Sequence, residues 1–147
     1  MHNRVAQFLV RRNGLPTILK HELADVWEQH LGRVKVETSD TTHLRKFYGS
    51  LYRTSFLPRT VNDVDGSYPA FSSGRTTHSS QTYYDDFSMW DTYRALHPLL
   101  VLLSPTKSGE MMQSLVDKYK QGGWLPIFPC WNSYTAAMIG DHCTATI

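Results

Sequence analysis

The sequence predicts an all-α fold in which loops of unequal length join the helices. Two observations favour this class: apolar residues recur every three or four positions in several segments, and glycine and proline separate those segments. Hydrophobic residues make up 41% of the 147 positions, enough for a packed core. A repeated order of helix, loop and helix is typical of helical-hairpin toroids, in which the active-site loops gather at one end. We therefore expect loops 58–81 and 122–135 to lie together.

Apolar stripes predict the first two helices. Residues 15–31 place their apolar side chains on one helical face, and Gly32 stands where a C-terminal cap is expected. The alternating residues 33–37 fit either a short strand or an extended connector. A second helix, rich in aromatic residues, follows with Ser39 or Asp40 as its N-cap and ends before the next proline.

A long loop is predicted for residues 58–81, because glycine, proline, serine, asparagine and aspartate dominate it without a sustained period. The segment has room for a small hairpin, and loops of this length in compact domains are commonly functional. Its oxygen donors followed by a glycine resemble the first half of a calcium loop: Asn62, Asp63, Asp65 and Gly66. Ser73 takes the twelfth position, where an EF-hand has glutamate, so an EF-hand is excluded and an Asx-rich turn is the alternative.

Three further helices are expected, which begin near Ser88, after Ser104 and near Thr135. The first is interrupted or restarted at Pro98, and the second stops at a pair of glycines. Residues 124–131 cannot be helical because two prolines punctuate them. With its tryptophans, this proline-rigidified loop has the composition of a pocket wall.

Two adjacent carboxylates, Asp85 and Asp86, stand among aromatic residues and directly before a helix with a Leu/Val run. A carboxylate among buried neighbours is costly unless polar groups satisfy it. The segment therefore predicts that both carboxylates have polar partners elsewhere in the chain.

A second polar group follows on the next predicted helix. Arg94 follows Asp91 by three positions and Trp90 by four, so the three side chains share one helical face. A solvated ion pair is one interpretation. Sugar recognition is the other, since a pyranose ring stacks on an indole while its hydroxyl groups bind charged partners. His97 is interpreted as a core or capping residue rather than a catalyst.

Charge and hydropathy exclude several classes of function. A net charge of +2 with scattered basic residues argues against a nucleic-acid partner. The longest apolar run, residues 99–103, is far shorter than the roughly 20 residues that span a bilayer, and the apolar patch at residues 8–10 is too short for a signal peptide. Cys130 and Cys143 form neither a disulfide framework nor a metal motif, so the compartment is not indicated.

Five motifs together resemble glycoside hydrolase family 92, the calcium-dependent exo-acting α-mannosidases. In order, they are FYGSLYRTSFLPRT, DVDGSYPAF, YYDDFSMWDTYRALHPLLVLLSP, YKQGGWLPIFPCW and MIGDH. The resemblance covers residues 23–147, and the insert at residues 72–82 is closer to fungal than to bacterial members. It implies that residues 15–147 are an N-terminal fragment of the catalytic (α/α)6 barrel, with the family's β-sandwich missing and residues 1–14 an unmatched leader.

The resemblance also implies a set of site residues. Asp65 and Gly66 correspond to the pair that binds mannose, and Trp90, Asp91 and Arg94 match a motif lining the same cavity. By this resemblance the carboxylates and the arginine of residues 83–105 are buried because they face that cavity.

No catalytic residue is expected in this chain. The resemblance implies an inverting mechanism whose general acid and base, like most calcium ligands, lie beyond Ile147. Tyr134 stands where many bacterial members have glutamate, which puts a carboxylate role there in doubt.

The function expected from this resemblance is that of a fragment, inactive alone, of an α-mannosidase that removes terminal α-1,2-linked mannose from N-glycans or mannans. Mannose-containing glycans are thus the expected partner, with neither nucleic acid nor membrane. Two alternatives stay open: a non-catalytic carbohydrate-binding helical module and a peptide-N-glycan amidase, although no Cys/His/Asp triad is evident for the latter.

Overall fold

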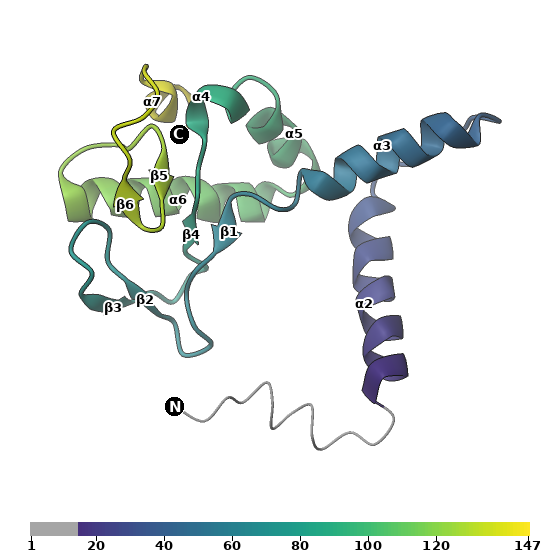
Figure 1. Cartoon of the computed structure of the whole chain (residues 1–147), viewed down its shortest axis with the longest axis horizontal. Coiled ribbons are helices and arrows are strands. Elements are labelled where there is room, and N and C mark those ends of the chain that lie inside the picture. The colour runs from purple at the N-terminus through teal and green to yellow at the C-terminus, as the bar shows by residue number, and fades with distance from the viewer. Residues whose placement is uncertain (1–14) are drawn as a thin grey trace. The chain divides into compact units, whose positions relative to one another are not determined.

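The computed structural model describes residues 15–147, which fall into two compact units divided between Tyr52 and Arg53 (Figure 1). Residues 1–14, the expected leader, lie outside the described residues, so that domain boundary stays a prediction. Helices dominate the described residues, and the strands there are pairs of two or three residues each. The predicted all-α class is confirmed. None of the described helices has the length and apolar character needed to cross a membrane.

The first unit consists of α2 (Leu15–Leu31) and most of α3 (Thr41–Arg53). α2 ends at the predicted glycine, whose N–H donates to Glu28 O at 2.8 Å. α3 begins after Asp40, and Asp40 Oδ1 accepts hydrogen bonds from the backbone N–H groups of Thr42 and His43. Asp40 rather than Ser39 is therefore the N-cap.

An extended connector, not a strand, joins α2 to α3. Tyr48 from α3 fixes it: the Tyr48 hydroxyl donates to Val34 O at 2.9 Å and accepts from Val36 N at 3.4 Å. The side chain thus supplies the hydrogen bonds that a neighbouring strand would otherwise provide.

The second unit contains three antiparallel strand pairs. β1 (Arg59–Thr60) pairs with β4 (Tyr84–Asp85), β2 (Ser67–Pro69) with β3 (Thr76–His78), and β5 (Pro129–Cys130) with β6 (Ser133–Tyr134). The β2–β3 pair is the small hairpin expected inside loop 58–81.

Four helices complete the second unit: α4 (Met89–Thr92), α5 (Leu96–Leu103), α6 (Pro105–Gly122) and α7 (His142–Thr146). α6 ends as predicted, because Gly123 adopts a φ of 88° and its N–H donates to Tyr119 O. The core of the unit forms where α5 and α6 pack against the segments around β4 and β5; its buried members are Tyr84, Phe87, Met89, Leu100, Met111, Leu115, Ile127 and Cys143.

Two predicted helix boundaries are wrong. The break between α4 and α5 falls at residues 93–95, and Pro98 lies in the first turn of α5, where its missing N–H has no helical acceptor. The last helix begins at His142 instead of Thr135. Ala136 and Met138 have positive φ angles of 54° and 68°, which a right-handed helix cannot contain.

The two long loops lie together, as predicted. Ser72 N donates to Asn132 O at 3.2 Å, and the Asn132 side-chain amide donates to Pro69 O. These contacts join the β2–β3 hairpin to the β5–β6 turn.

Candidate functional site

A buried ion pair lies at the centre of the loop cluster. Asp85 Oδ1 is 2.9 Å from Lys118 Nζ, and the two side chains are 1% and 0% exposed. Lys118 Nζ also donates to the Tyr83 hydroxyl at 2.7 Å and to Asn132 Oδ1 at 3.3 Å. Burial lowers the pKa of Lys118, and the negative charge of Asp85 opposes that shift. The ammonium group is thus surrounded by acceptors from β4 and the β5–β6 turn.

The two adjacent carboxylates hold the β5–β6 turn. Asp86 Oδ1 accepts the hydrogen bond of Trp131 N at 3.0 Å, and Asp85 Oδ2 accepts that of Asn132 N at 2.5 Å. The other oxygen of Asp86 pairs with Arg59 Nε. Two consecutive turn amides are therefore bound by two consecutive carboxylates, each with a cation behind it.

The network provides polar partners for both adjacent carboxylates. Asp85 and Asp86 are buried and have polar partners, as predicted, but those partners are cations and turn amides of the same unit. The expectation that the arginine of this segment is buried is wrong, because Arg94 is exposed in the described chain. Its charge is solvated and does not need a buried partner.

The helical face of α4 has the predicted members in a different arrangement. The Arg94 guanidinium lies 4.9 Å from the Trp90 ring centre, and its Nη2 donates to Trp90 O at 2.9 Å. Asp91 accepts a 2.5 Å hydrogen bond from Ser88 Oγ. No ion pair joins Asp91 to Arg94 in residues 15–147, so the cation–π contact replaces the interpretation as a solvated ion pair.

The Asp65–Gly66 pair forms an Asx-rich turn. Asp65 Oδ1 accepts from Ser67 N at 2.9 Å, and this hydrogen bonding lowers the pKa of the exposed Asp65 carboxyl. Gly66 has a φ of 84°, and a Cβ there would lie 2.4 Å from the carbonyl oxygen of Ser79. Only glycine fits this position.

The oxygen donors of this turn do not fit a calcium site. Asn62 Oδ1 accepts from Tyr83 N, just before β4, and Asp63 Oδ1 accepts from Val64 N within the turn, so both oxygens already bind backbone amides. Residues 15–147 contain no group of three or more histidine, cysteine, aspartate or glutamate side chains placed to hold a metal ion.

The structure does not bring the two predicted halves of the site together. In Figure 1 the loop between β1 and β2, which carries Asp65 and Gly66, lies at one end of the second unit, while α4 with Trp90, Asp91 and Arg94 lies at the other. A shared role of these five residues in sugar binding stays a prediction.

Three residues of the network were not identified from the sequence: Lys118, Arg59 and Asn132. For Lys118 a signal exists, because it continues the stripe of Met111 and Leu115 on α6 at helical spacing, where a cation is unexpected. Arg59 and Asn132 give no local signal, since the carboxylates that they bind are 27 and 47 positions away.

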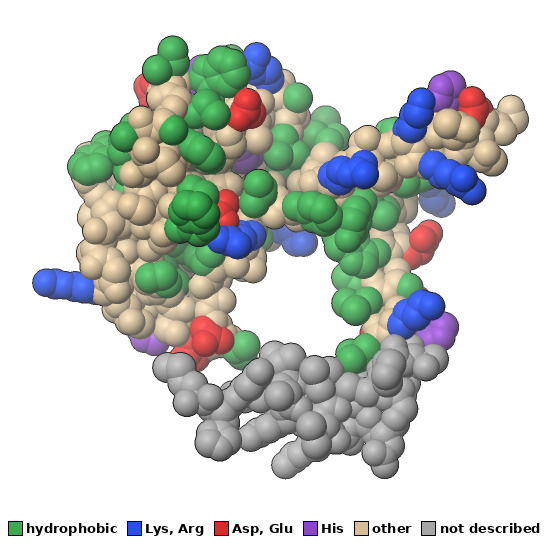
Figure 2. All heavy atoms as spheres, viewed as in Figure 1, with side chains coloured by type: hydrophobic (Ala, Val, Ile, Leu, Met, Phe, Trp, Pro, Cys, Tyr) green, Lys and Arg blue, Asp and Glu red, His purple; other side chains and the backbone are tan. Residues whose placement is uncertain are grey.

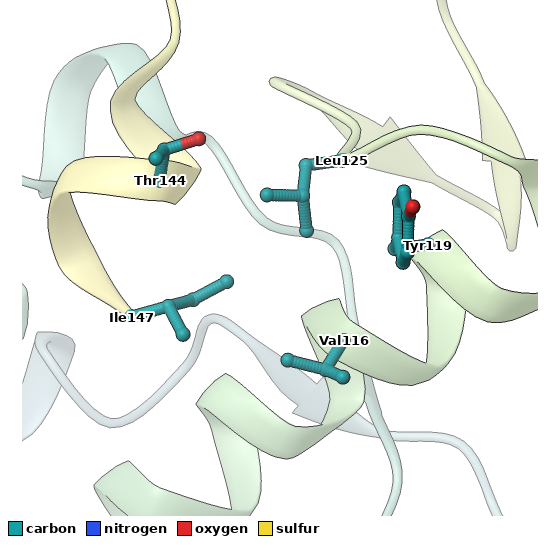
Figure 3. Close-up of a pocket in the computed structure, with 5 residues that line it drawn as sticks. All are labelled: Val116, Tyr119, Leu125, Thr144 and Ile147. Atoms are coloured by element: carbon teal, nitrogen blue, oxygen red, sulfur yellow. The ribbon is translucent and has the colours of Figure 1, made fainter.

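An apolar pocket of about 230 Å³ is lined by none of the ion-pair residues (Figure 3). Val116 and Tyr119 of α6, Leu125, and Thr144 and Ile147 at the last helix line it. Figure 3 shows the side chains of Tyr119, Leu125 and Ile147 facing one space. No charged side chain lines the pocket, so it offers burial to apolar groups and no acid–base chemistry.

Comparison with known proteins identifies close structural relatives. The family model described as the glycosyl hydrolase family 92 catalytic domain matches residues 17–147. The α-mannosidase BT3965 from Bacteroides thetaiotaomicron superposes with a TM-score of 0.83 and 29% identity, over 88% of this chain and 18% of that chain. The inverting mannosidase BT2199 of the same organism gives a TM-score of 0.81 and 30% identity, with the same coverage.

A further structure of BT3965, in complex with mannoimidazole, gives a TM-score of 0.78 and 30% identity, over 83% of this chain and 16% of that chain. The chain thus spans less than a fifth of the length of these solved relatives. No curated protein sequence matches it.

Proposed function

The chain belongs to glycosyl hydrolase family 92, and on this basis we propose that it is part of an inverting α-mannosidase acting on terminal α-1,2-linked mannose of N-glycans or mannans. Its helices form part of the family's (α/α)6 barrel, as its likeness to BT3965 and BT2199 shows. The observation that carries the proposal is the combination of a family match over residues 17–147 with TM-scores above 0.8 to two mannosidases.

The substrate-binding contribution of this chain is the second part of the proposal. Asp65 and Gly66 would bind a mannose ring, and Trp90, Asp91 and Arg94 would contact the same glycan. An exposed guanidinium stacked on an indole suits this role, because the indole offers an apolar face and the guanidinium has five N–H donors, one of which binds Trp90 O.

The catalytic carboxylates are proposed to lie outside this chain, so the chain alone would be inactive. Calcium would belong to the complete enzyme, with ligands mostly outside residues 15–147. The network of Asp85, Asp86 and Lys118 would have a positioning role, since its oxygen atoms are already engaged by turn amides and cations.

Hydrolysis of α-1,2-mannobiose, followed by proton NMR, tests the proposal. We expect no free mannose from the chain alone. A protein carrying this chain within a complete catalytic domain should release β-mannose first, as inversion requires, and should lose activity with a calcium chelator. A first product in the α configuration would contradict inversion.

Two outcomes would favour the alternatives. Glycan binding without turnover by the complete domain would favour a carbohydrate-binding module. Release of an intact glycan from a glycopeptide would favour the amidase.

A further inference from the structure

The β5–β6 turn has an unusual residue at its tip. Cys130 pairs with Ser133, so the loop between the strands consists of Trp131 and Asn132 alone. Both have positive φ angles, 51° and 56°. Positive φ at both central residues is the pattern of a type I′ turn, which strongly prefers asparagine and glycine.

The positive φ angle of Trp131 is unfavourable for a tryptophan. A bulky side chain at positive φ is a genuine outlier, whereas asparagine and glycine adopt this region readily. Strained residues of this kind persist when their surroundings fix them, and they cluster at ligand-binding sites. The tryptophan therefore requires an explanation from its side chain.

The surroundings do fix this backbone. Asp86 Oδ1 accepts from Trp131 N, and Asp85 Oδ2 accepts from the next amide, while Lys118 neutralises Asp85 from inside the unit. Asn132 is held in addition by Tyr83. The buried charges of the unit converge on the two residues at the turn.

The indole that this network presents is 81% exposed. Trp90 and Trp124, by contrast, are at most half exposed. Beside Trp131, the carboxylate of Asp86 that accepts its N–H also pairs with Arg59, whose side chain is 53% exposed. A flat apolar face next to an accessible ion pair suits a pyranose ring, whose C–H face stacks on an indole while its hydroxyl groups meet charged partners.

We propose that Trp131 is a sugar-binding platform, on which a pyranose ring of the glycan stacks, and that Asp86 and Asp85 are positioning residues for it. That the ring is mannose rests on the proposed function. The stacking itself rests on the turn geometry, on the hydrogen bonds that fix it and on the exposure of the indole.

The test uses the 147-residue chain with α-1,2-mannotriose, cellotriose and chitotriose as probes. NMR of the tryptophan indole N–H groups shows whether Trp131 is contacted, since its signal is identified by its loss in Trp131→Asn, and isothermal titration calorimetry compares affinities among the variants. We expect mannotriose to shift this signal. Trp131→Asn should weaken binding at least tenfold without lowering the melting temperature, because asparagine suits the turn better. Trp131→Phe should bind within about threefold of the wild type.

Trp124→Phe is the matched control, since Trp124 lies outside the network, and its binding should be unchanged. Asp86→Asn tests positioning: it retains the indole but weakens the bond that orients it, so binding should fall while the free indole stays exposed to a fluorescence quencher. Rigidity without a ligand-binding role would leave binding unchanged in this variant.

The outcomes separate this inference from the proposed function. Unchanged binding by Trp131→Asn, or a marked fall in its melting temperature, overturns the platform. Binding of cellotriose or chitotriose but not mannotriose, if it is lost in Trp131→Asn, supports the platform, overturns mannose as its ring and leaves the mannosidase proposal to the hydrolysis assay. Absence of any shift of the Trp131 signal overturns the platform and leaves the mannosidase proposal to the hydrolysis assay.

Discussion

Lys118 Nζ lies 2.9 Å from Asp85 Oδ1, with both side chains buried from solvent. Desolvation of two charges is costly, and their attraction often no more than offsets it, so such a pair is weak evidence of stabilisation. Its hydrogen bonds extend to the β5–β6 turn through Asn132. The pair is better understood as the device that fixes the turn.

Removal of one partner of this pair should be severe. We expect Lys118→Met to lower the free energy of unfolding by about 3 to 5 kcal/mol, because it leaves the Asp85 carboxylate buried and uncompensated. Urea denaturation measures this. Lys118→Met combined with Asp85→Asn should be less destabilising than the sum of the single changes. The exposed Lys120, which pairs with Asp117, is the control, and Lys120→Met should cost less than about 1 kcal/mol.

Two glycines of α6, Gly122 and Gly109, differ in the space available for an added methyl group. A Cβ at Gly122 would lie 2.8 Å from Cδ1 of the buried Phe71, whereas a Cβ at Gly109 would meet nothing within 4 Å. Gly122→Ala should therefore destabilise the protein by about 1 to 3 kcal/mol. Gly109→Ala should stabilise it by about 0.5 to 1 kcal/mol, because alanine loses less backbone entropy in a helix. Equal effects in thermal denaturation would contradict this packing.

Local signals in the sequence sufficed for much of the fold. Asp40 at the start of α3 and Gly123 after α6 act through neighbours in the same turn, so cap chemistry predicted both ends, each as one of two adjacent candidates. The start of α7 was mispredicted because Ala136 and Met138, residues with no turn preference, adopt positive φ angles.

The candidate site depends on contacts that sequence patterns do not encode. The sequence around Asp85 predicts a polar partner but does not identify it. Lys118 is 33 positions away and reaches Asp85 only when α6 packs against the segment around β4. The only indication in the sequence was that Lys118 lies on the apolar stripe of α6, where a cation is unexpected. Figure 2 shows charged side chains beside hydrophobic ones on the visible face.

His97 should make the stability of the protein depend on pH. It is buried against Phe87, and neither ring nitrogen has a hydrogen-bond partner in the described part of the chain. Burial lowers the pKa of His97 below its usual 6.5, so the unfolded chain binds a proton before the folded one does. Above pH 6.5 His97 is neutral in both states and does not make stability depend on pH. Below pH 6.5 the free energy of unfolding falls as the pH drops, because the unfolded chain binds the proton more readily.

The slope due to His97 should approach about 1.4 kcal/mol per pH unit between pH 6.5 and the lowered pKa. We expect His97→Phe to remove this component, as measured by urea denaturation at pH 7.5, 6.5 and 5.5. The exposed His78 serves as the control, since His78→Gln should retain the full slope. An unchanged slope in His97→Phe would show that His97 is protonated equally in both states.

Asp91 and Arg94 should contribute independently to activity, because each is bound to a different partner. Asp91 accepts from Ser88, and Arg94 donates to Trp90 O while it stacks on the indole. If Arg94 binds a sugar hydroxyl, Arg94→Ala removes a charge-assisted hydrogen bond of roughly 1.5 to 3 kcal/mol, or about ten- to a hundredfold or more in kcat/KM. The assay is α-mannoside hydrolysis by a protein carrying this chain in a complete catalytic domain, with folding checked by circular dichroism. The double change Asp91→Ala/Arg94→Ala should equal the product of the single effects, since the two side chains share no bond. A double variant no worse than Arg94→Ala alone would mean that Asp91 acts by orienting Arg94, through a contact formed only when substrate is bound.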